Sequence, residues 1–84
     1  MKKRRIRFCR HATLKFRLLR RHHFPVTEAQ VRHTVLNPVR TGVGYKGRRI
    51  AEASIDAEHV LRVVYEERGD NIEIVTFYPV RRSH

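Results

Sequence analysis

The spacing of apolar residues changes twice along this chain, from strand-like to helical and back to strand-like. Residues 5–10 alternate between polar and apolar, which predicts a short edge strand with Ile6 and Phe8 on one face. From His11 onward the apolar positions follow a helical period, while the basic positions stay on the outside. The apolar positions of this first expected helix are Ala12, Phe16, Leu18 and Leu19.

A second helix is expected to begin at Thr27 and to end at Asn37-Pro38. Phe24-Pro25 separates it from the first helix, because proline disfavours helical geometry in the residue before it. The segment Thr27–Gln30 has the pattern of a capping box, in which two side chains three residues apart satisfy each other's backbone amides. The residues of this helix that we expect to face the core are Ala29, Val31 and Val35.

The remainder of the chain has the alternation and composition of β-strands. Residues 39–45 contain two glycines, which predicts a bent or irregular strand, and residues 48–55 form a weaker strand pattern. The strongest patterns lie at 60–66 and 72–78, and residues 68–71 between them predict a hairpin. The expected order is β-α-α-β-β-β-β, an α+β fold with two N-terminal helices packed on a four- to five-stranded, mostly antiparallel sheet. We expect the other face of the sheet to be partly open for a ligand.

The length and the scarcity of cysteine limit what the chain can be. Its 84 residues suit one small domain, with residues 1–4 as a flexible basic tail, 5–79 as the α+β core and 80–84 as a C-terminal tail. The single cysteine, Cys9, excludes an intramolecular disulfide, and no residue spacing indicates a metal site or a cofactor. No apolar run reaches the roughly 18 residues that span a membrane, so we expect no membrane partner and a cytoplasmic location.

Positive charge is concentrated near the start of the chain. The formal net charge is +11, and residues 1–24 hold ten of the Lys and Arg side chains and none of the acidic ones. The positive charges in such a block repel one another unless an anionic partner binds there. The block therefore favours RNA or an acidic protein as partner, and a basic face that only contacts water is the less favoured alternative. The expected RNA-binding residues are Lys2, Lys3, Arg4, Arg5, Arg7, Arg10, Lys15, Arg17, Arg20 and Arg21.

Four residues suit cleavage of RNA without a metal, a reaction that needs a proton acceptor, a proton donor and cations. His11 precedes Lys15 by four residues on one helical face, and the surrounding cations favour the neutral imidazole that accepts a proton. Arg62 interrupts the most apolar strand, and Thr76 and Tyr78 share one face of the final strand. Simpler interpretations stay open: a helix-start histidine bonded to backbone, a solvent-facing arginine and a tyrosine at the edge of the core.

Short motifs in the chain resemble those of a family of small bacterial and archaeal proteins of unknown function. The resemblance covers residues 9–80, and the motifs are His11-Ala12 with the basic residues behind it, Asn37-Pro38, Leu61–Tyr65 and Ile74–Pro79. The family usually has Arg where Lys15 stands, and a short Gly-Ile step where this chain has His22–Pro25.

That family is similar to the RelE-type toxin ribonucleases, within the wider barnase, EndoU, colicin and RelE-like fold. The resemblance implies a toxin-like, metal-independent endoribonuclease paired with an acidic antitoxin-like protein, with ribosome-bound messenger RNA as one candidate substrate. By position it implies catalytic roles for His11, Arg62, Thr76 and Tyr78. Two other classes of function stay open, a non-catalytic nucleic-acid-binding module and a structural partner of an acidic protein, both using the same basic face.

Overall fold

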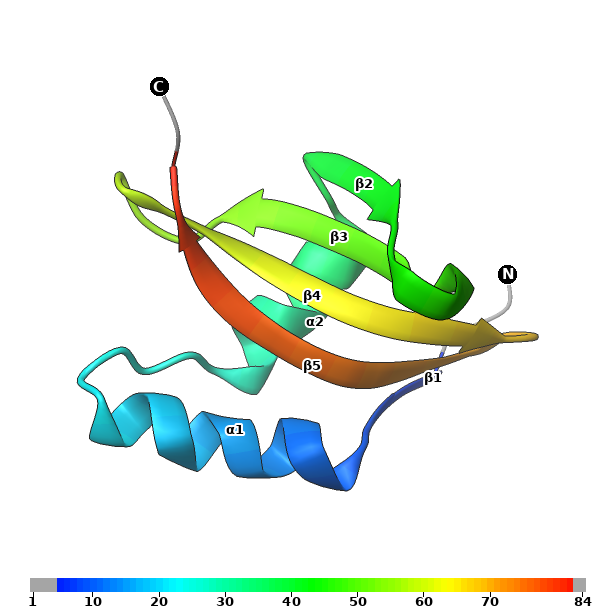
Figure 1. Cartoon of the computed structure of the whole chain (residues 1–84), viewed down its shortest axis with the longest axis horizontal. Helices are drawn as coiled ribbons and strands as arrows, with labels where there is room; N and C mark the ends of the chain where they lie inside the picture. The colour runs from blue at the N-terminus through cyan, green and yellow to red at the C-terminus, as the bar shows by residue number, and fades with distance from the viewer. Residues whose placement is uncertain (1–4, 83–84) are drawn as a thin grey trace.

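The computed structural model describes residues 5–82 as an α+β fold, in which two helices cover one face of a five-stranded sheet (Figure 1). The elements are β1 (Arg5–Phe8), α1 (Arg10–Arg21), α2 (Glu28–Leu36), β2 (Arg40–Val43), a 3-10 turn (Tyr45–Gly47), β3 (Arg49–Ser54), β4 (His59–Arg68) and β5 (Asn71–Arg81). The predicted class and element order are confirmed. Neither α1 nor α2 is long and apolar enough to cross a membrane. Lys2, Lys3 and Arg4, and residues 83–84 of the expected C-terminal tail, lie outside the described residues.

The sheet has the strand order β1-β5-β4-β3-β2. β2, β3, β4 and β5 pair antiparallel in succession, as their hairpin-length connections predict. β1 lies at the edge, where it pairs in parallel with the first part of β5, from Arg5 opposite Asn71 to Phe8 opposite Ile74. Beyond Ile74, α1 takes the place of a strand beside β5 (Figure 1).

Cys9 connects β1 to α1 and attaches both elements to β5. It is the N-cap of α1, and its sulfur accepts a hydrogen bond from the Ala12 amide at 3.5 Å. Its own amide donates to the Ile74 carbonyl and its thiol donates to the Val75 carbonyl, both at 3.1 Å. The expected strand over residues 5–10 therefore ends at Phe8, and the helix begins one residue before His11.

An irregularity in β5 decides which of its side chains face the helices. Tyr65 lies opposite Ile74, but the preceding Val64 lies opposite Thr76, so Val75 is an extra residue in β5. As a result Ile74 is buried under the helices, while Thr76 faces the other side of the sheet, here called the open face. Strict alternation would have placed both residues on one face.

The core lies between the helices and the sheet. Phe16 of α1 packs on Phe77 of β5 with ring centroids 4.6 Å apart, and Phe8 of β1 packs on Phe16 at 5.5 Å. Ile6 and Phe8 both lie against this core, as the alternation in the first strand predicts. The largest fully buried side chains are Phe77, Leu61, Ile72, Ile74, Val31, Val63 and Thr34.

α2 begins with the predicted capping box. The Gln30 amide donates to Thr27 Oγ1 at 3.1 Å, and the Thr27 amide donates to Gln30 Oε1 at 2.9 Å. Ala29 is exposed, so its predicted place in the core is wrong. Ala29 is two residues before the buried Val31, and each residue turns the helix by about 100°. Its side chain therefore lies about 200° around the helix from Val31. The buried residues of α2 are Val31, Thr34 and Val35.

β5 continues through Arg81, past the expected end of the final strand at Tyr78. Pro79 lies within this extension, opposite Leu61. Proline has no amide hydrogen to donate, and a strand tolerates it where the outer edge carries no further strand. The second half of β5 is such an edge, because β1 pairs only as far as Ile74.

Candidate functional site

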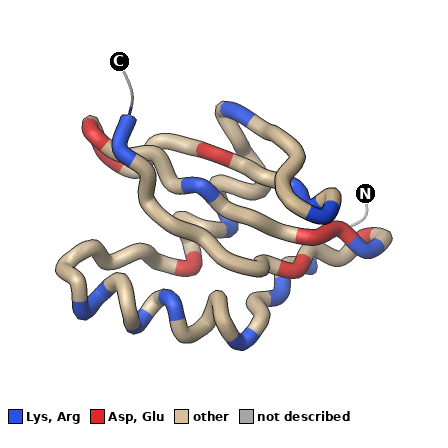
Figure 2. Tube along the Cα trace, viewed as in Figure 1, with Lys and Arg blue, Asp and Glu red and all other residues tan. Residues whose placement is uncertain are grey.

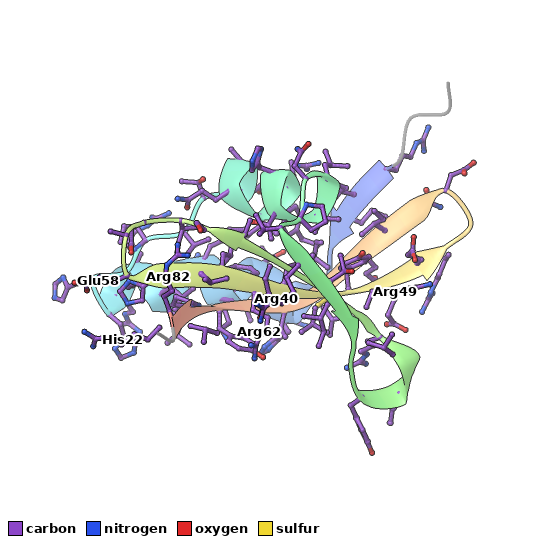
Figure 3. The ribbon with its side chains drawn as sticks, turned by 90° about the horizontal axis from the view of Figure 1, so that it is seen from above. His22, Arg40, Arg49, Glu58, Arg62 and Arg82 are labelled. Atoms are coloured by element: carbon purple, nitrogen blue, oxygen red, sulfur yellow. The ribbon has the colours of Figure 1, made fainter. Side chains whose placement is uncertain are left out.

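Tyr78 lies where α1 meets the open face, and two cations from different elements lie over its ring. Arg62 of β4, which is labelled in Figure 3, is opposite Tyr78 in the strand register. Its guanidinium carbon is 5.8 Å from the ring centroid of Tyr78. Lys15 reaches the same ring from α1, with Nζ 5.5 Å from the centroid. These separations are within the range of cation–π contacts. The Tyr78 cluster (Lys15, Arg62 and Tyr78) thus brings together three residues that the sequence singled out.

Glu52 of β3 holds Arg62 from the other side. The two residues are opposite each other in the β3–β4 register, and Arg62 Nε donates a hydrogen bond to Glu52 Oε2. Hydrogen bonding to Tyr78 and to Glu52 raises the pKa of Arg62 above its ordinary value, so the guanidinium is charged at any physiological pH. Nε is one of five N–H donors, so donors are left for an anion. Glu52 was not predicted, although an acid between Ala51 and Ala53 is a signal that could have found it.

Thr76 shares the open face with Tyr78, as predicted, but stands apart from the cluster. It lies opposite Val64 and is half-buried. Its hydroxyl makes no hydrogen bond with any residue from 5 to 82, so nothing holds it toward Arg62 or Lys15. Its place on the open face suits contact with a ligand more than proton transfer at Tyr78.

His11 lies at the exposed start of α1. Cys9, not His11, caps the helix, and the imidazole makes no hydrogen bond or ion pair with another described residue. His11 and Lys15, one turn apart, line a shallow hollow of about 290 Å³ on the outer side of α1. Lys15 therefore lies next to both His11 and Tyr78, whereas the structure places no contact between His11 and the ring or hydroxyl of Tyr78.

The cations of α1 are distributed along the whole length of the helix. Figure 2 shows basic residues along the whole helix and no acidic residue on it. None of them has an ion pair with an acidic residue of the described range, and all but Lys15 are exposed. Arg5 and Arg7 are exposed as well and carry the positive charge on to the edge of the sheet. The members of this α1 basic surface are Arg10, Lys15, Arg17, Arg20 and Arg21.

Two exposed leucines lie among these cations. Leu14 is 53 % exposed and Leu18 is 48 % exposed, and both line the hollow beside His11. Leu18 was expected on the apolar side of the helix, and this is wrong. The side that packs on the core runs through Ala12, Phe16 and Leu19, and Leu18 lies about 200° around the helix from Phe16.

The Tyr78 cluster and the α1 basic surface are the features of the described residues that contain the candidates named from the sequence. No group of three His, Cys, Asp or Glu side chains within residues 5–82 is placed to hold a metal ion. The resemblance to the RelE-type ribonucleases rests on short motifs and stays a prediction, because no protein-family model, curated protein or solved structure matches the chain.

Proposed function

We propose that the protein binds RNA on the α1 basic surface and cleaves it at the Tyr78 cluster, as a toxin-like endoribonuclease that uses no metal. The observation that carries this proposal is the placement of Lys15 and Arg62 over the Tyr78 ring, at 5.5 and 5.8 Å from its centroid. A hydroxyl able to transfer a proton thereby lies beside two cations able to stabilise charge that develops on phosphorus.

The α1 basic surface supplies the affinity for RNA in this proposal. Its cations have no acidic neighbour on the helix, and four of the five are arginine, whose planar fork suits phosphate. α1 packs beside the second half of β5, where Phe16 contacts Phe77 and Lys15 lies over Tyr78. A strand of RNA bound along α1 would therefore pass the Tyr78 cluster.

The proposed reaction is attack of a ribose 2′-oxygen on the adjacent phosphorus, with departure of the 5′-oxygen of the next nucleotide. His11 accepts the proton of the 2′-hydroxyl, and Tyr78 donates a proton to the leaving oxygen. Lys15 and Arg62 stabilise the negative charge of the pentacoordinate intermediate. Thr76 contacts the ribose on the open face. The products carry a 2′,3′-cyclic phosphate or, after its hydrolysis, a 3′-phosphate.

A second candidate function is RNA binding without cleavage on the same surface. Two observations favour it: Arg62 is already paired with Glu52, and His11 stands apart from Tyr78. Under this alternative the cations over Tyr78 orient the RNA and transfer no proton.

An acidic, antitoxin-like protein is the second partner that we propose. Leu14 and Leu18 are exposed on a helix face that is otherwise basic, which suits a partner segment with apolar and acidic residues. Such a partner would cover the same surface as RNA, and binding of the two would be mutually exclusive.

Incubation of the purified protein with end-labelled RNA in EDTA, followed by mapping of the product ends, tests the nuclease. Tyr78→Phe is the most informative variant, because it keeps the ring under Lys15 and Arg62 and removes only the hydroxyl. We expect it to bind RNA within a few-fold of the parent protein and to cleave at least about 100-fold more slowly. An unchanged rate would remove Tyr78 from the chemistry. If the parent protein cleaves no RNA, ribosome-bound messages included, the nuclease is rejected and RNA binding without cleavage is the function that is left.

A further inference from the structure

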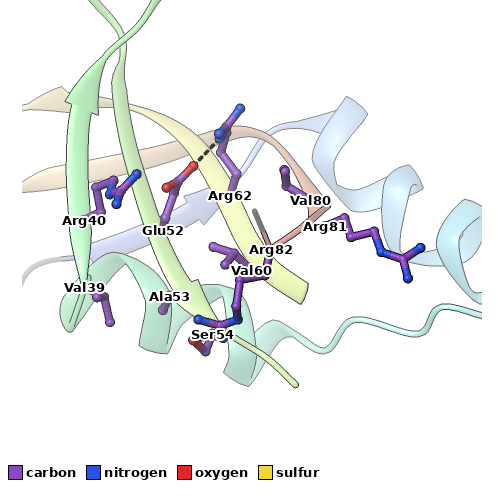
Figure 4. A pocket seen from close by; sticks show the side chains of 10 residues that line it. All are labelled: Val39, Arg40, Glu52, Ala53, Ser54, Val60, Arg62, Val80, Arg81 and Arg82. Carbon is purple, nitrogen blue, oxygen red and sulfur yellow. Dashed lines mark hydrogen bonds and ion pairs between the residues drawn. The ribbon is translucent and has the colours of Figure 1, made fainter. Parts of the chain in front are cut away.

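A second basic feature lies on the open face, at the end of the sheet where β5 finishes. It is a hollow of about 270 Å³ whose walls include four arginines and a single acidic residue (Figure 4). Only Arg62 among these arginines was predicted from the sequence to be functional. The polar residues that matter to the argument are Arg40, Glu52, Ser54, Arg62, Arg81 and Arg82.

Arg40 and Arg62 flank Glu52 from opposite sides. Arg40 of β2 and Arg62 of β4 are each opposite Glu52 of β3 in the strand registers. Only Arg62 is paired with the carboxylate, and the Arg40 guanidinium makes no hydrogen bond or ion pair within residues 5–82. One carboxylate thus faces two guanidinium groups, and one of them keeps all its donors.

Arg82 closes the opposite wall of the hollow in a defined position. Its backbone amide donates to the Glu58 carbonyl at 2.7 Å, and its Nη2 donates to Ser54 Oγ at 2.5 Å. The Ser54 oxygen accepts that hydrogen bond, so its own proton is left to donate to an anion. Arg81 differs: its side chain extends away from the other labelled residues in Figure 4 and lies 4.0 Å from Glu58.

The size and lining of the hollow suit a phosphate group with part of its sugar. A volume of about 270 Å³ is the space of about nine water molecules, and is slightly smaller than the usual pocket for a drug-sized ligand. Val60 and Val80 supply an apolar wall beside the arginines. Planar guanidinium groups with several donors are the side chains best matched to phosphate oxygens.

We propose that this hollow is a binding site for the phosphate group of a nucleotide, held by Arg40, Arg62 and Arg82 with a hydrogen bond from Ser54. Arg62 belongs both to this site and to the Tyr78 cluster. A nucleotide chain would therefore place one phosphate at Tyr78 and another in the hollow. That last step rests on the proposed function, whereas binding of the phosphate group does not.

The test is titration of the ¹⁵N-labelled protein with four probes at constant ionic strength, followed through backbone amide shifts. The probes are inorganic phosphate, uridine monophosphate, uridine and the dinucleoside monophosphate UpU. We expect phosphate and uridine monophosphate to shift the amides of Ser54, Arg62 and Arg82, and uridine to leave them in place. Binding of UpU as well identifies an internal phosphodiester as a ligand, and binding of the two monoesters alone identifies a terminal phosphate. Either result supports a phosphate site.

Three variants separate this site from general attraction to a basic protein. Arg40→Gln combined with Arg82→Gln should weaken phosphate binding at least about tenfold, as expected for loss of charged hydrogen bonds. Arg68→Gln is the control for one of these two charges, because it removes a single charge on β4 about 20 Å along the strand from Arg62. It should change the affinity less than twofold. Glu52→Gln should tighten binding several-fold, because Glu52 is the one acid among the described residues that line the hollow.

Several results would overturn the site. The first is binding of uridine as tightly as uridine monophosphate. The second is a loss of affinity in Arg68→Gln that is half the loss in the double variant on a logarithmic scale, as an effect of net charge alone requires. The third is weaker phosphate binding in Glu52→Gln. RNA cleavage by a protein that binds no phosphate in the hollow would remove this site and leave the proposed function. Phosphate binding by a protein that cleaves no RNA would support this site and reject the proposed nuclease function.

Discussion

The hydrogen bonds of the Cys9 sulfur should be measurable in the stability of the whole fold. The sulfur caps α1 by accepting from the Ala12 amide and ties the helix to the β5 bulge by donating to the Val75 carbonyl. Cys9→Ala removes both bonds. Loss of an N-cap side chain costs about 0.5–2 kcal/mol, and the partly buried sulfur adds packing, so we expect a loss of about 1–2 kcal/mol. In a domain of this size that lowers the melting temperature by about 4–16 °C.

Cys9→Ser separates hydrogen bonding from packing. Serine is a better N-cap than cysteine, and its hydroxyl can both accept from Ala12 and donate to Val75. Urea denaturation followed by circular dichroism should place Cys9→Ser within about 0.5 kcal/mol of the parent protein, with Cys9→Ala clearly below both. Equal losses in the two variants would refute the hydrogen-bonding role and leave the sulfur as a packing group.

Three further predictions concern salt, pH and the acidic partner. Contacts with about five phosphates should weaken binding of single-stranded RNA roughly 100-fold between 50 and 200 mM salt in filter-binding assays. Arg17→Gln with Arg21→Gln should reduce the log–log slope by about 1.4, and a flat parent curve would contradict RNA binding. Hydrogen bonds from the Glu58 amide, and from the side chain and amide of His59, lower the pKa of Asp56 from its ordinary 3.8. The unfolded chain is therefore protonated first as pH falls, stability declines below about pH 4, and Asp56→Asn should flatten that decline in thermal melts. An equally steep decline of stability with falling pH in Asp56→Asn would show that Asp56 is not its cause. An acidic partner at about 100 times its Kd should add about 2.7 kcal/mol to stability. Leu14→Ser with Leu18→Ser should abolish that gain, and a complex that still binds RNA would contradict a shared surface.

Local patterns in the sequence were sufficient to predict the type and the order of the helices and strands. The alternation at 60–66 and 72–78, with Gly69 between them, predicts the central hairpin because strand periodicity and turn residues are local properties. The capping box at Thr27 and Gln30 is local for the same reason. The parallel pairing of β1 with β5 is different, because it joins segments more than sixty residues apart. The extra residue at Val75 is different as well, because no turn residue or glycine marks it.

The same distinction applies to the candidate site. Arg62 was identifiable because a charge in the most apolar strand is costly without a role. Its pairing with Glu52 and its closeness to Tyr78 follow only from the strand registers. The approach of Lys15 to Tyr78 depends on where Cys9 attaches α1 to β5, which is a tertiary property. His11, chosen by its helical spacing from Lys15, meets neither Arg62 nor Tyr78, because spacing along a helix does not determine what faces it across the fold.

The most direct test of the nuclease compares single-turnover cleavage of prebound RNA by Lys15→Gln and Arg20→Gln. Each variant removes one positive charge from the α1 basic surface, but only Lys15 lies over the Tyr78 ring. The two variants should therefore bind RNA with similarly reduced affinity. Lys15→Gln should cleave bound RNA about 100-fold more slowly than the parent protein, and Arg20→Gln should stay within about threefold of it. Equal cleavage rates in the two variants would contradict catalysis at the Tyr78 cluster.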